Sequence, residues 1–202
     1  MGGVFDPPHV GHLAVAHQAW WQLGLDEVRV TPVGSPPHRN ETPLHSGDER
    51  ADLVLAAIQD HSGLRLWREE LDRSGPSYSA DTVAVLAREC PGAEIWFIMG
   101  ADQLATFSQW RRPEAVIAGA RLAVAPRPGV SVAEAETRAG AVVEGRVDWL
   151  DMPAIALSST EIRSRIERGL PLRYLVPDGV ERTLRASGRL LASARDGYPD
   201  GT

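Results

Sequence analysis

The chain has 202 residues, 43% of them apolar and 24% charged, with a formal net charge of −6. This composition is typical of one globular domain, and the negative charge argues against broad nucleic-acid binding, which relies on a basic surface. A single cysteine, Cys90, excludes an internal disulfide, and no stretch approaches the ~20 apolar residues of a membrane span, so we expect a cytoplasmic protein without membrane partners.

Residues 2–12 read Gly-Gly-Val-Phe-Asp-Pro-Pro-His-Val-Gly-His, which predicts a glycine-permitted turn that leads into a helix. The apolar residues that follow fall on one helical face: Leu13, Ala16, Trp20 and Leu23. His9 and His12 are therefore expected at a helix N-terminus. Unpaired N–H groups and about half a positive charge favour anions there.

Two histidines three residues apart also suit a zinc pair or an exposed surface. The rest of the chain offers one cysteine and no further carboxylate-histidine cluster at metal-ligand spacing. We therefore expect no metal ligands in the protein and interpret His9 and His12 as phosphate-binding groups.

Only Met1 precedes the turn at Gly2-Gly3, whereas a typical strand has ~5–6 residues. In a doubly wound fold the phosphate-binding turn follows the first strand, and an empty slot there would expose the edges of its neighbours. We expect Met1 to be an internal methionine at the end of that strand, with the natural protein beginning upstream. The alternative is a chain that folds poorly.

Further strands are indicated by apolar runs at 28–33, 64–67, 95–99, 121–125 and 147–150. Helix starts are indicated at Ser46-x-x-Glu49, Ser79, Ser158-x-x-Glu161 and Pro177-Asp178, and 131–141 predicts an exposed alanine-rich helix. This alternation predicts a doubly wound, Rossmann-like parallel α/β sheet in one domain, residues 1–191, with a small helical C-terminal part. Residues 192–202 are expected to be a disordered tail.

Ligands of such a sheet bind beyond the carboxyl ends of its strands, where 100–102 and 158–160 are expected. The hydroxyls and N–H groups of 158–160, with Arg163 one turn on, can bind phosphate. Alone, Ser158 and Glu161 indicate only a capping box. Together with the two histidines they favour a ligand with several phosphates, such as ATP. No GxGxxG follows a strand, which disfavours a dinucleotide cofactor.

At this point the chain resembles a known superfamily. Residues 2–12 resemble the GxFDPxHxGH signature of the adenylyltransferases and cytidylyltransferases, and Leu157–Arg163 resembles their ISSTxIR motif. Segments 76–82 and 100–102, followed by Phe107 and Trp110, are similar to elements of the bacterial nicotinate-nucleotide adenylyltransferases. The resemblance runs over most of residues 2–190.

The resemblance implies transfer of AMP from ATP to nicotinate mononucleotide in NAD biosynthesis, giving deamido-NAD and pyrophosphate, with Mg²⁺ carried by the ATP phosphates. The catalytic residues that it implies are His9, His12 and Arg163. The implied ATP contacts are Gly3, Val4, Phe5, His9, His12, Gly100, Asp102, Ser158, Ser159, Thr160 and Arg163.

The contacts implied for nicotinate mononucleotide are Arg39, Ser79, Asp102, Trp110 and Arg111. Trp110 would stack on the pyridine ring, although large aromatic residues often serve only for packing. Backbone N–H groups near Ser79 and Arg111 would receive the carboxylate. The chain departs from the family pattern at Val4, where threonine or serine is usual, and at Arg111, where an aromatic residue is more frequent.

Two alternatives stay open at this stage. One is a sister adenylyltransferase that uses nicotinamide mononucleotide or phosphopantetheine. His9 counts against the phosphopantetheine branch, which usually carries threonine there. The other is a non-catalytic nucleotide-binding sensor. The sequence predicts no oligomeric state.

Overall fold

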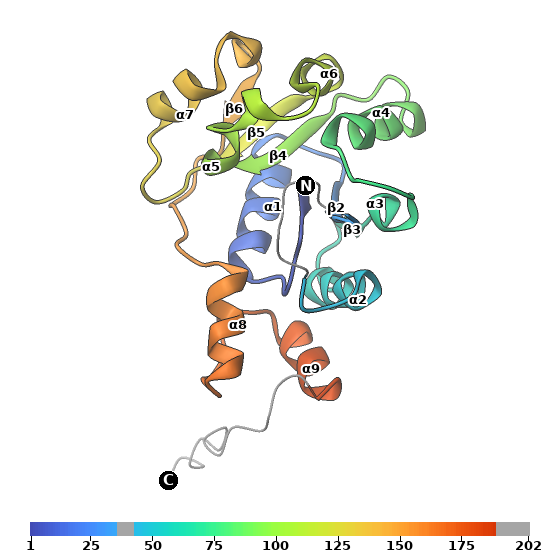
Figure 1. The fold of residues 1–202 in the computed structure, drawn as a ribbon, viewed down its shortest axis with the longest axis vertical. Coiled ribbons are helices and arrows are strands. Elements are labelled where there is room, and N and C mark those ends of the chain that lie inside the picture. The colour runs from blue at the N-terminus through green and yellow to red at the C-terminus, as the bar shows by residue number, and fades with distance from the viewer. Residues whose placement is uncertain (36–42, 189–202) are drawn as a thin grey trace.

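The computed structural model describes residues 1–35 and 43–188, whose strands form two adjacent parallel sheets (Figure 1). The first contains β1 (Gly2–Gly3), β2 (Val28–Pro32) and β3 (Leu64–Leu66), and the second contains β4 (Trp96–Gly100), β5 (Arg121–Ala125) and β6 (Val147–Trp149). Every pairing is parallel, and β1 contacts β4. The resulting order, 3-2-1 followed by 4-5-6, is that of the doubly wound Rossmann fold and confirms the predicted class.

Helices alternate with these strands and cover them (Figure 1). They are α1 (Val10–Gln22), α2 (Gly47–Ile58), α3 (Glu69–Asp72), α4 (Ser79–Glu89), α5 (Ala101–Leu104), α6 (Pro113–Gly119), α7 (Val132–Ala139), α8 (Ser159–Glu167) and α9 (Asp178–Ala186), with short 3₁₀ turns at Phe107–Gln109 and Ala141–Val143. No helix in the part of the chain that the structure describes is long and apolar enough to cross a membrane.

The serine signals locate two helix starts correctly. Ser46 precedes α2 and its side chain accepts from the N–H of Glu49 at 3.2 Å, while Ser158 precedes α8 and accepts from Glu161 N–H at 3.1 Å. Such caps satisfy N–H groups that have no partner within the helix. The helix start indicated at Ser79 is also found, since α4 begins at Ser79, but its cap is Tyr78 and not the serine.

The helix predicted at 131–141 exists as α7, and most of its residues are exposed as expected, but one side of it is buried. Ala135 and Ala139 are fully buried in the cluster around β4 and β5. Their small side chains allow α7 to approach α5 closely. The alanines on this side of α7 therefore form its packing interface with α5. The predicted tail, 192–202, lies outside the described residues.

A small third cluster of buried side chains joins the C-terminal helices α8 and α9 to α2. Its members are Leu53, Ile162, Leu172, Val176, Val180 and Leu184. Because α8 begins beside the turn that follows β1, this cluster fixes the position of the second phosphate motif relative to the first (Figure 1).

Arg50 is a buried arginine on α2, with only 2% of its surface exposed. Its guanidinium donates to the carbonyl oxygens of Val4 at 2.9 Å and Val33 at 2.8 Å. It therefore ties the turn after β1 to the loop after β2, and it satisfies two carbonyl groups that helices and strands leave unpaired.

We expect Arg50→Met to lower the free energy of unfolding by about 2 kcal/mol or more, since each buried carbonyl that loses its donor costs ~1–3 kcal/mol. Urea denaturation measures the change. Arg68→Met, which removes an exposed arginine paired with Asp48 and Asp72, is the matched control and should cost less than about 1 kcal/mol. Equal losses in the two variants would contradict this role for Arg50.

Candidate active site

A cavity of 310 Å³ lies at the carboxyl ends of the central strands, where a doubly wound fold binds its ligands. The turn after β1 and the first residues of α1, α5 and α8 line it. The structure brings every residue that the sequence assigned to ATP to this one cavity: Gly3, Val4, Phe5, His9, His12, Gly100, Asp102, Ser158, Ser159, Thr160 and Arg163.

The turn after β1 is tightly packed and adopts unusual backbone angles. Phe5 is buried and has φ +52°, a conformation that costs free energy for a residue with a side chain. A Cβ atom at Gly3 would come within 2.9 Å of the Phe5 ring, and one at Gly11 would come within 3.0 Å of the His9 ring. The glycines of the motif therefore make room for the aromatic and histidine rings.

The two histidines stack at the start of α1, with their ring centroids 3.7 Å apart. His9 is the residue before the first turn, and its backbone N–H donates to Nδ1 of His12 at 3.2 Å. Because Nδ1 of a neutral His12 accepts this bond, its proton lies on Nε2, which is left as a donor. Nδ1 of His9 is buried and has no hydrogen-bond partner among the described residues.

Both imidazoles are held in the neutral form at neutral pH. Burial, followed by the nearby positive charge of Arg127, lowers the pKa of His9 to about 4. Burial also lowers the pKa of His12 well below its ordinary value, with smaller contributions from His9 and Arg127. Neutral imidazoles retain one N–H donor each, which suits hydrogen bonding to a phosphate oxygen.

Asp6 supports the turn from inside the protein, where only 2% of its surface is exposed. Its carboxylate accepts from the backbone N–H of Leu44 at 2.6 Å and contacts Nδ1 of His45. Burial alone would raise the pKa of Asp6, but the hydrogen bonds from His45 and Leu44 outweigh burial and lower it. This role of His45 could not be predicted from the sequence, since the two residues meet only in the folded chain.

The start of α8 is bonded directly to the same turn. Ser159 donates its hydroxyl to the carbonyl of Pro7 at 2.9 Å, and Arg163 donates to the carbonyl of Asp6 at 2.9 Å. Arg163 also donates to Oγ1 of Thr160 at 3.1 Å. The two motifs, about 150 residues apart in the sequence, thus form one continuous surface with two helix N-termini, which suits a ligand with several phosphates.

Arg127 lines the cavity and was missed in the sequence analysis. Its Nε lies 3.6 Å from the carboxylate of Asp102, and Nη1 donates to the carbonyl of Ile155 at 3.3 Å. A side chain at Gly100 would collide with both Asp102 and Arg127. The sequence could have indicated Arg127, because this residue follows the carboxyl end of β5, and ligands are expected at that edge of the sheet.

Of the residues assigned to nicotinate mononucleotide, Asp102 lines this cavity, whereas Ser79, Trp110 and Arg111 do not. The Arg111 guanidinium lies 4.4 Å from the centroid of the Tyr78 ring, which brings Arg111 beside Ser79 at the start of α4. The ring of Trp110 packs at 5.8 Å from Phe97 and at 5.2 Å from Phe107. Arg39 lies outside the described residues. These roles stay predictions.

The described residues contain no group of three or more histidine, cysteine, aspartate or glutamate side chains that could hold a metal ion. The positive groups near the cavity are instead Arg163, Arg127 and the helix N-termini. A chain with a net charge of −6 thus gathers positive groups where an anionic ligand would bind.

The fold and this cavity define the class of protein. Residues 1–165 match the model of the cytidylyltransferase-like family. Among solved structures, the chain is similar in fold to a Plasmodium falciparum nicotinic acid mononucleotide adenylyltransferase complexed with NaAD, with a TM-score of 0.74 at 15% identity over 93% of each chain. The same enzyme complexed with APC gives a TM-score of 0.73 at 14% identity, also over 93% of each chain.

Relatives with higher sequence identity to this chain identify the family within that class. The chain is 37% identical to a "probable nicotinate-nucleotide adenylyltransferase" of Moorella thermoacetica, over 93% of this chain and 88% of the relative. It is 40% identical to a protein of the same description from Exiguobacterium sibiricum, over 91% of this chain and 93% of the relative. The chain belongs to the family of nicotinate-nucleotide adenylyltransferases.

The lowered pKa of His9 predicts how stability depends on pH. Between the ordinary value of 6.5 and about 4, the unfolded chain binds a proton at this position and the folded chain does not. Stability should therefore fall as pH drops through this window, by on the order of 3 kcal/mol from His9.

We expect His9→Gln to reduce the loss of stability between pH 6.5 and pH 4, as measured by denaturant titration at several pH values. His17→Gln, which replaces an exposed histidine on the same helix, should leave most of the loss in place. A His9→Gln profile parallel to that of the unmodified chain would show that His9 is not held neutral.

Proposed function

We propose that this chain transfers the adenylyl group of ATP to nicotinate mononucleotide, releasing pyrophosphate and deamido-NAD, as a step of NAD biosynthesis. The observation that carries the proposal is the single cavity in which the His9–His12 pair meets the start of α8. The names of relatives at 36–40% identity support the same substrates. The single Cys90 fits a reducing compartment, and we place the reaction in the cytoplasm.

The chemistry requires no covalent intermediate on the protein. A phosphate oxygen of nicotinate mononucleotide forms a bond to the α-phosphorus of ATP, while the bond from that phosphorus to the bridging oxygen of the β-phosphate breaks. The electron pair leaves with pyrophosphate. Because the second pKa of a phosphate monoester is about 6, the attacking group is mostly dianionic at neutral pH and needs no general base.

Catalysis therefore reduces to positioning and to stabilisation of charge. His12 would donate from Nε2 to a phosphate oxygen, since its Nδ1 already accepts from the His9 N–H. The polar atom that His9 would offer to the ligand is Nε2, since its Nδ1 is buried. Arg163 and the first N–H groups of α8 would hold the phosphates that leave.

Nucleotidyltransferases that use ATP typically require a divalent cation. We propose Mg²⁺, carried by the ATP phosphates and neutralising part of their charge. Around it, Arg127 and Arg163 supply fixed positive charge from the protein, and Asp102, an exposed carboxylate paired with Arg127, is placed to accept from a ribose hydroxyl.

For the second substrate, we propose that the backbone N–H groups near Ser79 and Arg111 receive the nicotinate carboxylate. The contact of Arg111 with Tyr78 supports this, because it brings both positions to the start of α4. Trp110 would offer the exposed part of its half-buried ring to the pyridine. We also propose that Arg39 binds the phosphate group of nicotinate mononucleotide, and this proposal rests only on the resemblance of the sequence to the family.

We expect His12→Ala to lower kcat by about 10²-fold or more, at ~1.4 kcal/mol for each factor of ten, while the fold persists. The reason is the loss of the Nε2 donor at the reacting phosphate. Pyrophosphate release under saturating substrates measures the effect.

His17→Ala, which removes an exposed imidazole five residues further along α1, is the control and should retain kcat. A His12→Ala enzyme with unchanged kcat would refute the assignment. If neither the unmodified chain nor the His17→Ala control converts ATP with any acceptor, the chain is a nucleotide-binding protein without catalysis.

Backbone donors at Ser79 and Arg111 also predict selectivity. We expect nicotinamide mononucleotide to react more slowly than nicotinate mononucleotide, since the N–H groups of its amide would face donors, at a cost of ~1–3 kcal/mol. Product mass and kcat/KM for the two substrates, with phosphopantetheine as a third acceptor, provide the test. Equal kcat/KM values for the two pyridine nucleotides would exclude this carboxylate site.

A further inference from the structure

Two consecutive arginines, Arg111 and Arg112, lie in the turn that leads into α6, and both side chains contact the start of α4. The guanidinium of Arg111 lies 4.4 Å from the centroid of the Tyr78 ring. The guanidinium of Arg112 forms an ion pair with the carboxylate of Asp81. The turn is therefore joined to α4 at two points, each by a positively charged side chain.

The backbone of this turn has an unusual conformation at Arg112, where φ is +53°. A residue before a proline is normally extended, and Pro113 is the first residue of α6. A positive φ costs free energy for a residue with a side chain, so it persists only where other contacts hold it. The ion pair with Asp81 is one such contact. It helps to fix the bend, and with it the direction in which the neighbouring Arg111 leaves the chain.

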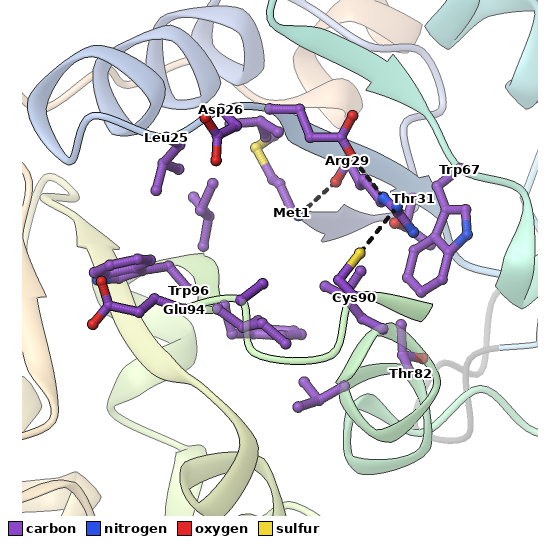
Figure 2. A pocket seen from close by; sticks show the side chains of 18 of the residues that line it. Met1, Leu25, Asp26, Arg29, Thr31, Trp67, Thr82, Cys90, Glu94 and Trp96 are labelled. Atoms are coloured by element: carbon purple, nitrogen blue, oxygen red, sulfur yellow. Dashed lines mark hydrogen bonds and ion pairs between the residues drawn. The ribbon is translucent and has the colours of Figure 1, made fainter. Parts of the chain in front are cut away.

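The start of α4 has a defined position, because buried hydrogen bonds hold it on both sides of Tyr78. Ser77 is buried, and its hydroxyl accepts from the N–H of Gly34 at 3.2 Å. Thr82 is also buried and donates its hydroxyl to the carboxylate of Glu70 at 2.7 Å. Thr82 lies on the side of α4 that faces an inner cavity of the protein (Figure 2). The ring that carries the Arg111 guanidinium thus belongs to an anchored segment.

The positive charge of Arg111 is not neutralised by the part of the chain that the structure describes. Among residues 1–35 and 43–188, no carboxylate pairs with Arg111 and no oxygen accepts a hydrogen bond from its guanidinium, whereas Asp81, the acidic residue in the first turn of α4, is paired with Arg112. An aromatic face attracts a guanidinium without using its in-plane N–H donors. One unpaired charge with free donors therefore remains beside Ser79.

The chemistry of this group matches the substituent that distinguishes the two candidate pyridine nucleotides. A planar guanidinium can bind a carboxylate through two parallel N–H···O bonds that are strengthened by opposite charge. A carboxamide has one acceptor oxygen, two N–H donors and no charge, so it gains little from the same group. Backbone N–H groups distinguish the two substituents by hydrogen bonding only, whereas Arg111 also distinguishes them by charge.

We propose that the guanidinium group of Arg111 is a second receptor for the carboxylate of the acceptor nucleotide and makes the selection of nicotinate over nicotinamide depend on charge. This inference rests on the proposed function. Asp81 and Arg112 are positioning residues in it: their ion pair holds the turn, and it neutralises a carboxylate that would otherwise repel the substrate.

The test measures kcat/KM for both pyridine nucleotides by pyrophosphate release. Arg111→Gln keeps the backbone N–H and removes the charge. We expect it to lower kcat/KM about tenfold for nicotinate mononucleotide and less than about twofold for nicotinamide mononucleotide, as the loss of one partly screened charge implies. Arg111→Lys retains the charge and should recover most of this loss. KM for ATP should stay unchanged in both variants.

Arg88→Gln is the matched control, because it removes an exposed arginine from the last turn of α4, far from Tyr78. It should leave the ratio of the two kcat/KM values unchanged. An unchanged ratio in Arg111→Gln, equal losses for the two nucleotides, an equal change in Arg88→Gln, or no recovery in Arg111→Lys would overturn the inference.

Calorimetric binding of each nucleotide separates this inference from the proposed function. A chain that prefers nicotinate mononucleotide, loses that preference in Arg111→Gln and releases no pyrophosphate would refute the proposed function and support the role of Arg111. The absence of both binding and turnover would overturn the two together.

Discussion

Three carbonyl groups of the turn after β1 accept hydrogen bonds from side chains on two helices that are distant in sequence. Arg50 on α2 holds Val4, Arg163 on α8 holds Asp6, and the Ser159 hydroxyl holds Pro7. The turn contains a residue with positive φ, so without these donors it would relax to another conformation. The positions of the two histidines, the start of α1 and the start of α8 all depend on these bonds.

This arrangement also explains how the chain combines a negative net charge with an anion site. The imidazoles are neutral because they are buried beside Arg127, so they act as hydrogen-bond donors and contribute no net charge. The fixed positive charges are arginines whose guanidinium groups are already oriented by backbone carbonyls or by a carboxylate. A site of this kind needs little reorganisation when a phosphate group enters, which is the condition for effective electrostatic catalysis.

Much of this could be predicted from sequence. Strand periodicity located the strands after β1, and the serine caps located the starts of α2 and α8, because these features depend on neighbouring residues only. The pairing of His45 with Asp6 and the burial of Ala135 could not be predicted, because both depend on contacts between distant segments. Arg127 was predictable in part. Its position after a strand could be recognised in the sequence, but only the fold showed that it lies beside the histidines.

The C-terminal helices carry half of the anion site on a cluster of only six buried side chains. A unit of this size opens locally at a lower free energy than the whole domain unfolds. A nucleotide bound across α1 and α8 opposes that opening, by about 2.7 kcal/mol at a ligand concentration 100 times Kd. With the proposed function, the substrate would therefore hold α8 and α9 in place, and the resistance of these helices to proteases would depend on the supply of nucleotide.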